Sequence, residues 1–385
     1  MSDFLTNRST ILDGQKCPRS QWLQYYWGGS GLMRKAQSVP LATGSMVHEG
    51  VERLMRGANE DDAAGQAVAA YRESIAKRAL DDDLDGWLAY EQESLAEALV
   101  RVHARVCMPQ IRASYDILGV EADDCREIAA GIGWQFRVDA SLRDKATGGL
   151  VAYSLKTASQ WHQSKQEEIA CDMQGLSEAW GLEQATGEEC EYVKMDFLLK
   201  GPRKRTGELG RREQMSPLVR AWMSDDVVPK YAWRWEWTDA EGTHRLSPKK
   251  WRAFSVWEVM GVKEWLDMLL GGGVQPEAGS PVDSIVVAYP PIFRNPRHLD
   301  RWKRQIIAQA GRTRYALGEI VDMKATDSPE LDVWFPQHTQ RCHDYSAQCS
   351  FYEICHGGLS GDPIASGEFM EREPHHSATL GGDDE

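Results

Sequence analysis

One stretch of the chain decides the fold, and it reads IGWQFRVDASLRDKATGGLVAYSLK over residues 132–156. Apolar and polar side chains alternate over 132–143, a pattern typical of a half-buried β-strand. The segment KATGG that follows contains turn formers, and the apolar run at 150–156 predicts a second strand. We therefore expect a β-hairpin that carries Asp139 on its first strand and Lys156 at the end of its second.

The segments on either side of this hairpin predict helices and one further strand. Ser45 is a good N-cap residue, so we expect a helix to begin there and to run through HEGVERLMRG. Two more helical stretches are expected over about 62–80 and 86–115, packed beside the first. After the hairpin, residues 165–186 predict a helix and residues 190–199 predict a strand. This order favours an α/β core with a helical insertion.

The composition is that of a folded but acidic protein. Hydrophobic residues make up 42% of the 385 residues and charged residues 26%, which permits a large core and excludes global disorder. No apolar run approaches the roughly 18 residues that a membrane span needs. The N-terminus lacks a signal-peptide layout, so we expect a cytoplasmic protein with no membrane partner. The net charge of -14 argues against a general polyanion-coating protein, although a nucleic-acid enzyme needs only a local basic stripe.

Asp139 and Lys156 are a candidate catalytic pair. Lys156 follows Asp139 by 17 positions, and the turn of the hairpin can bring the two residues close together. A carboxylate can hold a hard divalent cation, and a lysine can stabilise developing negative charge or orient an attacking water. The pair therefore suits metal-assisted hydrolysis of a phosphodiester, and a solvated cross-strand ion pair is the simpler alternative.

Four motifs follow one another along the chain. They are GSMVHEGVERL at 44–54, VDASLRD at 138–144, SLKT at 154–157 and DMQGLSEAW at 172–180. In this order they resemble the RecB/AddB-type branch of the PD-(D/E)XK nuclease superfamily. The resemblance implies a mixed β-sheet flanked by helices, in a stand-alone protein similar to phage-encoded members, which would place it in a host cytoplasm.

The same resemblance implies an activity and a set of site residues. The activity is Mg²⁺- or Mn²⁺-dependent hydrolysis of DNA, exonuclease-like, in recombination, repair or phage DNA metabolism. His48, Asp139, Lys156 and Gln174 occupy catalytic positions of the family, and His48 and Asp139 also occupy metal-binding positions. Glu178 stands where the family has a tyrosine.

Ser154 departs from the family pattern, which has Asp or Glu at that position. A neutral hydroxyl cannot replace the charge of a carboxylate, so two explanations compete. The site is either inactive, which makes the chain a DNA-binding or recombination accessory protein, or its carboxylate has moved to the following helix. Glu168 and Asp172 lie on one face of that helix, with Asp172 favoured and Glu167 as a third candidate. An ordinary solvated helix face would explain the same acids.

The cysteines form a second candidate site. The chain has eight, and disulfides are not expected in a cytoplasmic protein. Cys342, Cys349 and Cys355 cluster as C-x6-C-x5-C, and Cys17 is the candidate for a fourth thiolate ligand. The remaining cysteines are isolated and are expected to be core or surface thiols.

This layout of one early cysteine and three late ones resembles the iron–sulfur staple of AddB-type nucleases. The resemblance implies a [4Fe–4S] cluster that joins the two ends of the chain. Zinc suits four thiolates equally well, and His343 or His356 is an alternative to one cysteine. Three unconnected thiols in a loop are the simplest alternative.

Two basic segments stand out in this acidic protein, at 200–212 and 294–314. Such segments can bind phosphates, although a solvated surface explains each equally well. Trp302 is a candidate for stacking on a base. No base-reading motif and no P-loop occur, so we expect sequence-independent DNA binding and a helicase or recombination partner for any unwinding. The candidate DNA-binding residues are Lys200, Arg203, Lys204, Arg205, Arg301 and Arg304.

We expect one elaborated nuclease domain over residues 1–360, followed by an acidic, disordered tail over 361–385. In its second half, strands are expected over 231–238 and 284–289, and helices over about 248–270 and 297–318. The expected parts are a helical arm at 45–120, the catalytic core at 125–200, a mixed α/β extension at 201–340 and the cysteine cluster at 341–356.

Overall fold

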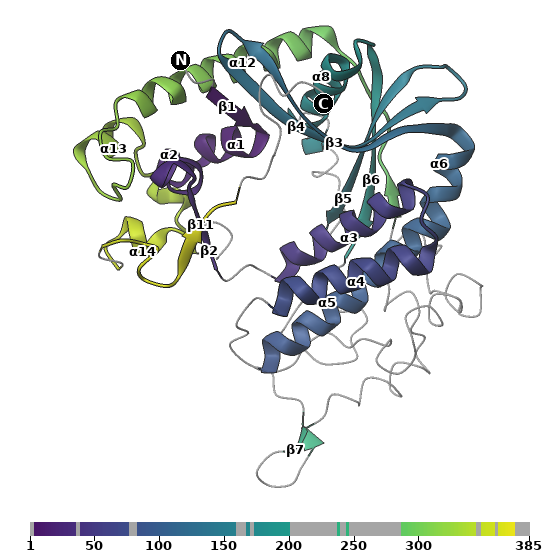
Figure 1. Cartoon of the computed structure of the whole chain (residues 1–385), viewed down its shortest axis with the longest axis horizontal. Coiled ribbons are helices and arrows are strands. Elements are labelled where there is room, and N and C mark those ends of the chain that lie inside the picture. Colours follow the sequence, from purple (N-terminus) through teal and green to yellow (C-terminus); the bar gives the residue numbers. More distant parts are fainter. Residues whose placement is uncertain are drawn as a thin grey trace, which may run out of the picture.

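The structure of the chain is a computed structural model, shown in Figure 1. The expected helix over 248–270 and most of the strand over 231–238 lie outside the residues that it describes, as does the tail beyond 373. The described residues are 4–35, 39–76, 83–158, 167–169, 173–200, 237–238, 244–245, 286–343, 348–358 and 361–373.

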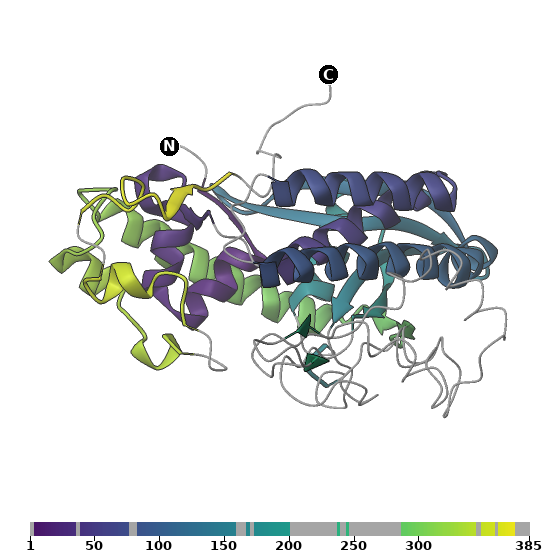
Figure 2. The same ribbon diagram turned by 90° about the horizontal axis from the view of Figure 1, so that it is seen from below.

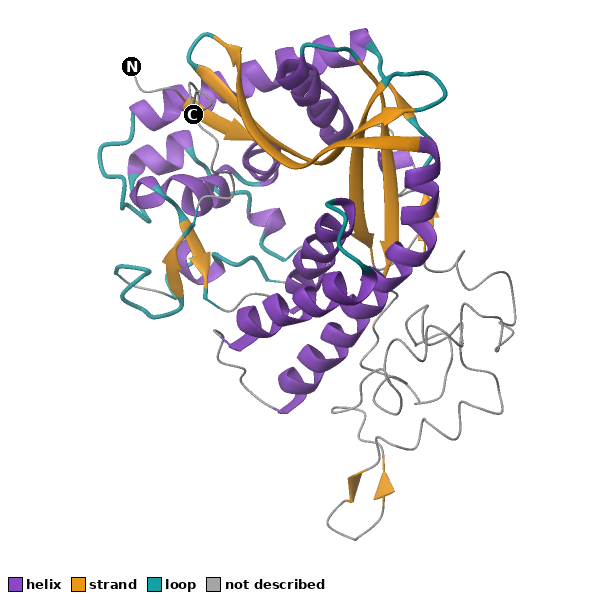
Figure 3. Ribbon diagram, turned by 45° about the vertical axis from the view of Figure 1, so that its right-hand side comes forward, coloured by secondary structure: helices purple, strands orange, loops and turns teal. Residues whose placement is uncertain are grey.

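A mixed β-sheet forms the centre of the molecule, as the sequence predicts (Figure 3). The predicted hairpin is present, with Ala140 paired to Tyr153, and its turn places Gly148 in the left-handed region at a φ of 75°. The strand order is β1-β4-β5-β6-β10, with β3 also paired to β4 and β9 to β6. The bounds are β1 Phe4–Asn7, β3 Tyr115–Ala129, β4 Ile132–Asp144, β5 Leu150–Ala158, β6 Cys190–Leu199, β9 Val286–Ala288 and β10 Ile292–Phe293.

Helices cover both faces of this sheet. On one face, three helices form the predicted helical arm and lie side by side (Figures 1 and 2). The other face is covered by two helices, α8 and α12, which pack on a separate apolar core. The helices of the arm are α3 Val39–Met55, α4 Glu60–Ala76 and α5 Asp83–Val102, continued by a π-helical turn at His103–Cys107 and by α6 Met108–Ser114. The helices of the second face are α8 Met173–Thr186 and α12 Pro296–Gly318.

The start of α3 differs from the prediction. The helix begins at Val39, so Ser45 lies inside it and is not its N-cap. Apolar residues such as Met46, Val47 and Val51 lie in the core between the arm and the sheet. Burial of this apolar face, which outweighs a capping preference of about 1 kcal/mol, accounts for a helix that extends beyond the serine.

Strand β3 is the longest of the strands that the sequence did not predict. It pairs with β4 along almost its whole length, from Tyr115 opposite Asp144 to Ala129 opposite Ile132. Its sequence, YDILGVEADDCREIA, is rich in acids and lacks clean alternation. The strand therefore owes its existence to pairing with β4, because local propensity for strands is weak and is often overridden by tertiary context.

Helix α12 is an element whose position follows from residues close together in the sequence. Asn295 accepts hydrogen bonds from the backbone N–H groups of Arg297 and His298, and Pro296 occupies the first helical position. Leu299, Trp302 and Ile306 recur at helical spacing and are buried against the sheet. The opposite face of the helix carries its charged residues.

The two ends of the chain meet in a third apolar core, at the left of Figure 1. Strand β2 pairs antiparallel with β11, and Trp22 and Trp27 are buried against residues from the C-terminal segment. The guanidinium of Arg19 is buried there and donates to the carbonyl oxygen of Phe335 at 2.9 Å. The elements of this region are α1 Arg8–Lys16, α2 Pro18–Gln21, β2 Leu32–Arg34, α13 Pro329–Trp334, α14 Tyr352–Cys355 and β11 Phe369–Glu371.

Two short strands, β7 Trp237–Thr238 and β8 His244–Arg245, pair with each other.

Across the described ranges, none of the helices combines the length and the apolar character that a bilayer crossing requires.

Candidate active site

A pocket of about 610 Å³ opens between the helical arm, the sheet and the N-terminal end of α1. Its lining includes all four residues that the sequence placed in catalytic positions, which are His48, Asp139, Lys156 and Gln174. They come from α3, β4, β5 and α8, so four elements that are distant in sequence converge on one cavity.

Asp139 is the centre of this arrangement. Its Oδ2 accepts a hydrogen bond from the backbone N–H of Leu155 at 2.6 Å, and its Oδ1 lies 3.5 Å from Nδ1 of His48. Burial alone would raise the pKa of Asp139, but the charge of Lys156 and the neighbouring His48 lower it to about 2. The carboxylate is therefore ionised throughout the neutral range and can bind a cation.

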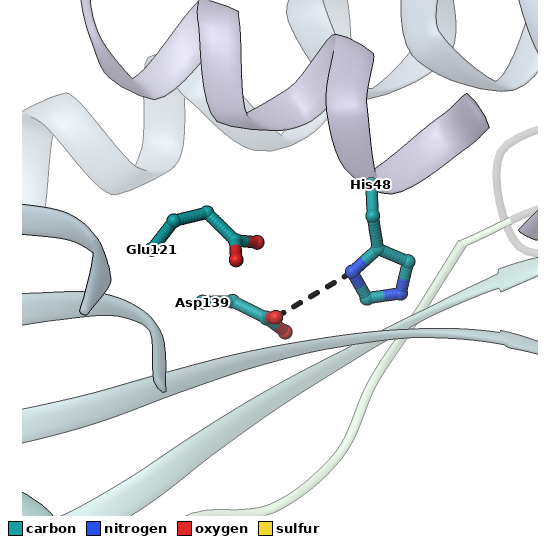
Figure 4. Close-up of side chains that lie close together, drawn as sticks. All are labelled: His48, Glu121 and Asp139. Carbon is teal, nitrogen blue, oxygen red and sulfur yellow. Dashed lines mark ion pairs between the residues drawn. The ribbon is translucent and has the colours of Figure 1, made fainter. Parts of the chain in front are cut away.

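Glu121 joins His48 and Asp139, and the sequence did not point to it. One ligand atom from each of the three residues lies within 4.8 Å of the others. Figure 4 shows the three side chains close together. Glu121 is on β3 and faces Asp139 on β4, since the flanking pairs are Val120 with Ala140 and Ala122 with Val138. Its position beside Asp139 was not predicted, because the strand that carries it was not predicted. In the sequence Glu121 is one acid in a polar segment, and such a segment does not indicate which acid lies in a site.

Glu121 has an unfavourable backbone conformation, and its negative charge is in an unfavourable environment. Its φ of 52° is the single positive value among the non-glycine residues that the structure describes, and such a conformation costs roughly 1–3 kcal/mol. Burial, and then the nearby carboxylate of Asp139, raise its pKa to about 6, although Arg137 forms an ion pair with it at 3.1 Å. Two carboxylates directly opposite each other in a sheet repel, and a divalent cation between them would relieve that repulsion.

Glu178, on α8, fills the space beside Ser154. Its Oε1 accepts hydrogen bonds from Ser154 Oγ at 3.1 Å and from Gln174 Nε2 at 2.6 Å, and lies 4.0 Å from Lys156 Nζ. Gln174 and Glu178 are four residues apart, so the helix presents both on one face. The residue is 4% exposed, and its Oε2 has no hydrogen-bond partner among the described residues.

This environment opposes ionisation of Glu178. Burial raises its pKa to about 7, with Asp139 adding to the effect and Lys156, Gln174 and Ser154 opposing it. A buried carboxylate with an unpartnered oxygen, in a pocket lined by a lysine, is a candidate functional group.

The acids that the sequence favoured for this position lie elsewhere or are not described. Glu167 and Glu168 are exposed and do not line the pocket. Asp172 lies outside the described residues. The structure brings one helical carboxylate, that of Glu178, to hydrogen-bonding distance of Ser154, and the sequence analysis did not propose Glu178 as the relocated acid.

The four cysteines of the second candidate site come together. Cys17, Cys342, Cys349 and Cys355 all line one small pocket of about 20 Å³. The backbone N–H of Cys349 donates to the carbonyl oxygen of Cys342 at 2.9 Å, which closes the loop between them. All four thiols are free, so the pocket offers four sulfur donors from the two ends of the chain.

Two histidines were alternatives to a cysteine in this site. Nε2 of His356 lies 3.5 Å from Sγ of Cys342, whereas His343 does not line the pocket and contacts the ring of Tyr352. Three further cysteines, Cys107, Cys125 and Cys190, are buried away from the pocket.

The candidate DNA-binding residues are only partly described. Lys200 directly follows β6 and is the last residue of that described range. The described residues do not include Arg203, Lys204 and Arg205. Arg301 and Arg304 are exposed on α12.

The expectation that Trp302 stacks on a base is wrong. Trp302 is 3% exposed and packs edge-on against Trp134, with ring centroids 5.4 Å apart. It occupies the apolar face of an amphipathic helix, and that face is turned to the sheet.

No protein-family model matches this chain, and no curated protein matches it either. The geometry of the two sites is therefore what bears on function.

Proposed function

We propose that the chain is a metal-dependent nuclease that hydrolyses phosphodiester bonds in DNA. The observation that carries the proposal is the convergence of His48, Asp139, Lys156 and the buried Glu178 in one pocket. An ionised carboxylate, an imidazole and a lysine in one open cavity suit hydrolysis of a charged ester better than a structural role.

The donor set fits a hard divalent cation, Mg²⁺ or Mn²⁺. Asp139, Glu121 and His48 offer two carboxylate oxygens and one imidazole nitrogen that already lie within 4.8 Å of one another. When bound, the cation would act as a Lewis acid on the phosphate and lower the pKa of water.

Lys156 has the other chemical role. Its Nζ lies 4.0 Å from Oε1 of Glu178, and its positive charge stabilises the ionised carboxylate of Asp139. Hydrolysis joins a water oxygen to phosphorus and breaks one phosphorus–oxygen ester bond. Lys156 stabilises the negative charge that develops on the phosphate during that step, or orients the water.

Glu178 supports the active interpretation over the inactive one. The pattern Ser154-x-Lys156 lacks a carboxylate on the strand, and Glu178 restores one from the adjacent helix at hydrogen-bonding distance from Ser154. Ser154 itself is the observation that favours the alternative, a DNA-binding or recombination accessory protein on the same fold.

For the cysteine site we propose a [4Fe–4S] cluster, with zinc as the alternative. The four cysteines that line the small pocket match the ligand count of a [4Fe–4S] cluster, which four thiolates hold. The same four thiolates suit zinc equally well.

The test is digestion of linear and circular DNA by the purified protein with Mg²⁺, Mn²⁺ or a chelator. We expect cleavage with either metal and none with the chelator. Comparison of linear with circular DNA also separates exonuclease from endonuclease action. Protein that binds DNA but cuts neither form with any metal would be the accessory protein.

A further inference from the structure

A line of arginines follows the exposed face of α12. Positions 297, 301, 304 and 312 are separated by three, four or eight residues, so their side chains project from one side of the helix. All four residues are exposed, and none of their guanidinium groups forms an ion pair or hydrogen bond within the described part of the chain. We call Arg297, Arg301, Arg304 and Arg312 the α12 arginines.

Their lack of partners is unusual in this protein. Other surface arginines are paired with acids, such as Arg72 with Glu93 at 2.9 Å and Arg143 with Glu188 at 2.7 Å. In a chain of net charge -14, these four arginines share α12 with a single acid, Asp300, and form a local positive surface. A surface of this kind attracts a polyanion.

An aromatic groove continues this surface at the C-terminal end of α12. Tyr315 lies one turn after Arg312 on the same face and is 59% exposed. Its ring contacts that of Trp334 on α13 edge-on, with centroids 5.2 Å apart. Both rings and Arg312 line a pocket of about 620 Å³.

We infer that the α12 arginines and this groove bind a single strand of nucleic acid. The arginines contact successive phosphates, and an unpaired base stacks on Tyr315. A duplex satisfies only the first half of this arrangement, because its bases are stacked on one another and cannot reach an aromatic side chain. The inference rests on the proposed function and names a single strand as the form of DNA that this surface holds.

Helix α1 connects this surface to the catalytic pocket. Residues 7–9, at its N-terminal end, line the catalytic pocket, and Gly14 and Gln15, near its C-terminal end, line the aromatic groove. The helix has nine residues, so it is roughly 13 Å long. One helix of this length therefore connects the lining of the aromatic groove with the lining of the catalytic pocket.

Binding can be measured without cleavage. Asp139→Ala protein in a chelator is titrated against a labelled oligodeoxythymidine and against a duplex of equal length, with fluorescence anisotropy as the signal. We expect the single strand to bind more tightly. Replacement of both Arg301 and Arg304 by Ala should weaken binding and reduce the slope of log affinity against log salt by about 1.4.

Tyr315 gives the sharper test. Tyr315→Ala should weaken single-strand binding by about tenfold or more and leave duplex binding unchanged, whereas Tyr315→Phe should bind as the parent does. Arg72→Ala removes the same charge as one α12 substitution at a distant site and should have no effect.

Unchanged binding by Tyr315→Ala, or tighter binding of the duplex, would overturn the inference. The result is independent of nuclease activity. If wild-type protein cuts DNA while the α12 variants bind normally, only this inference fails. If the α12 surface binds the single strand but the wild type never cuts DNA, only the proposed activity fails.

Discussion

The carboxylate of Glu178 lies against the hydroxyl of Ser154, with 3.1 Å between Oε1 and Oγ. The strand position that lacks an acid is therefore adjacent to a buried acid from the next helix. The other oxygen of Glu178 is buried and has no hydrogen-bond partner among the described residues.

We predict that Glu178→Gln lowers DNA cleavage by at least about 100-fold. The substitution keeps the shape and the hydrogen bond from Ser154 but removes the charge that would bind a cation. Initial rates of digestion with Mn²⁺ give the measurement, and a thermal melt verifies folding. Glu168→Gln is the matched control, since Glu168 is exposed and does not line the pocket. Equal rates for the two variants would show that Glu178 does not serve the reaction.

Asp139→Asn and Lys156→Ala should each abolish cleavage while the protein stays folded. Both side chains line the pocket and neither belongs to an apolar core, so their loss affects the site more than stability. The expected loss is about two orders of magnitude or more, measured in the same digestion assay. Retention of full activity by either variant would contradict the assignment.

Glu121→Gln should weaken Mn²⁺ binding without unfolding the protein. The substitution removes one of two facing carboxylates, and each contributes a full charge to a hard cation. Isothermal titration calorimetry measures the affinity, with Glu168→Gln again as the control. An affinity equal to that of the wild type would mean that Glu121 serves only its ion pair with Arg137.

Anaerobically purified protein should be brown and contain about four irons per chain. Cys349→Ser should remove the colour and lower the melting temperature, because a bound cluster stabilises the fold that positions its ligands. Cys125→Ala is the control, since Cys125 lies on β3 away from the cysteine pocket and its replacement should leave the iron content unchanged. If the purified protein were colourless and contained one zinc per chain, the iron–sulfur proposal would be wrong and zinc would be the metal of this site.

His103 should make the folded protein less stable in acid. It is fully buried beside the hydroxyl of Tyr153, 3.0 Å from its Nε2, and burial lowers its pKa to about 3. The unfolded chain, with a histidine pKa of about 6.5, binds a proton that the folded chain does not. Stability from this group is therefore present above about pH 6.5 and falls as pH decreases from there toward 3, by at most about 1.4 kcal/mol per pH unit.

Urea denaturation at a series of pH values, in a chelator, measures this slope. His103→Gln can retain a hydrogen bond to Tyr153 but does not titrate, so its unfolding free energy should depend less on pH in that window. Identical pH profiles for the two proteins would show that His103 is not the group responsible.

Local sequence chemistry determined much of the fold. Alternation and the KATGG turn predicted the hairpin of β4 and β5, and the cap at Asn295 with apolar residues at helical spacing accounts for α12. These elements depend on residues close in sequence, so their signals are readable without a structure. The motif order likewise pointed to His48, Asp139, Lys156 and Gln174, which the structure brings to one pocket.

Only the tertiary structure decided which carboxylates line the pocket together with Asp139. Glu121 is on a strand that exists because β4 pairs with it, and its neighbour Asp139 is 18 positions later in the sequence. Glu178 reaches Ser154 because α8 packs across the sheet, whereas the sequence marked it only as the residue at the family's tyrosine position and favoured Asp172 and Glu168 as the relocated acid. Helical spacing specifies which residues share a face of a helix. Whether that face is buried, and what it contacts, depends on long-range packing. This packing buries Glu178, whereas Glu168 is exposed.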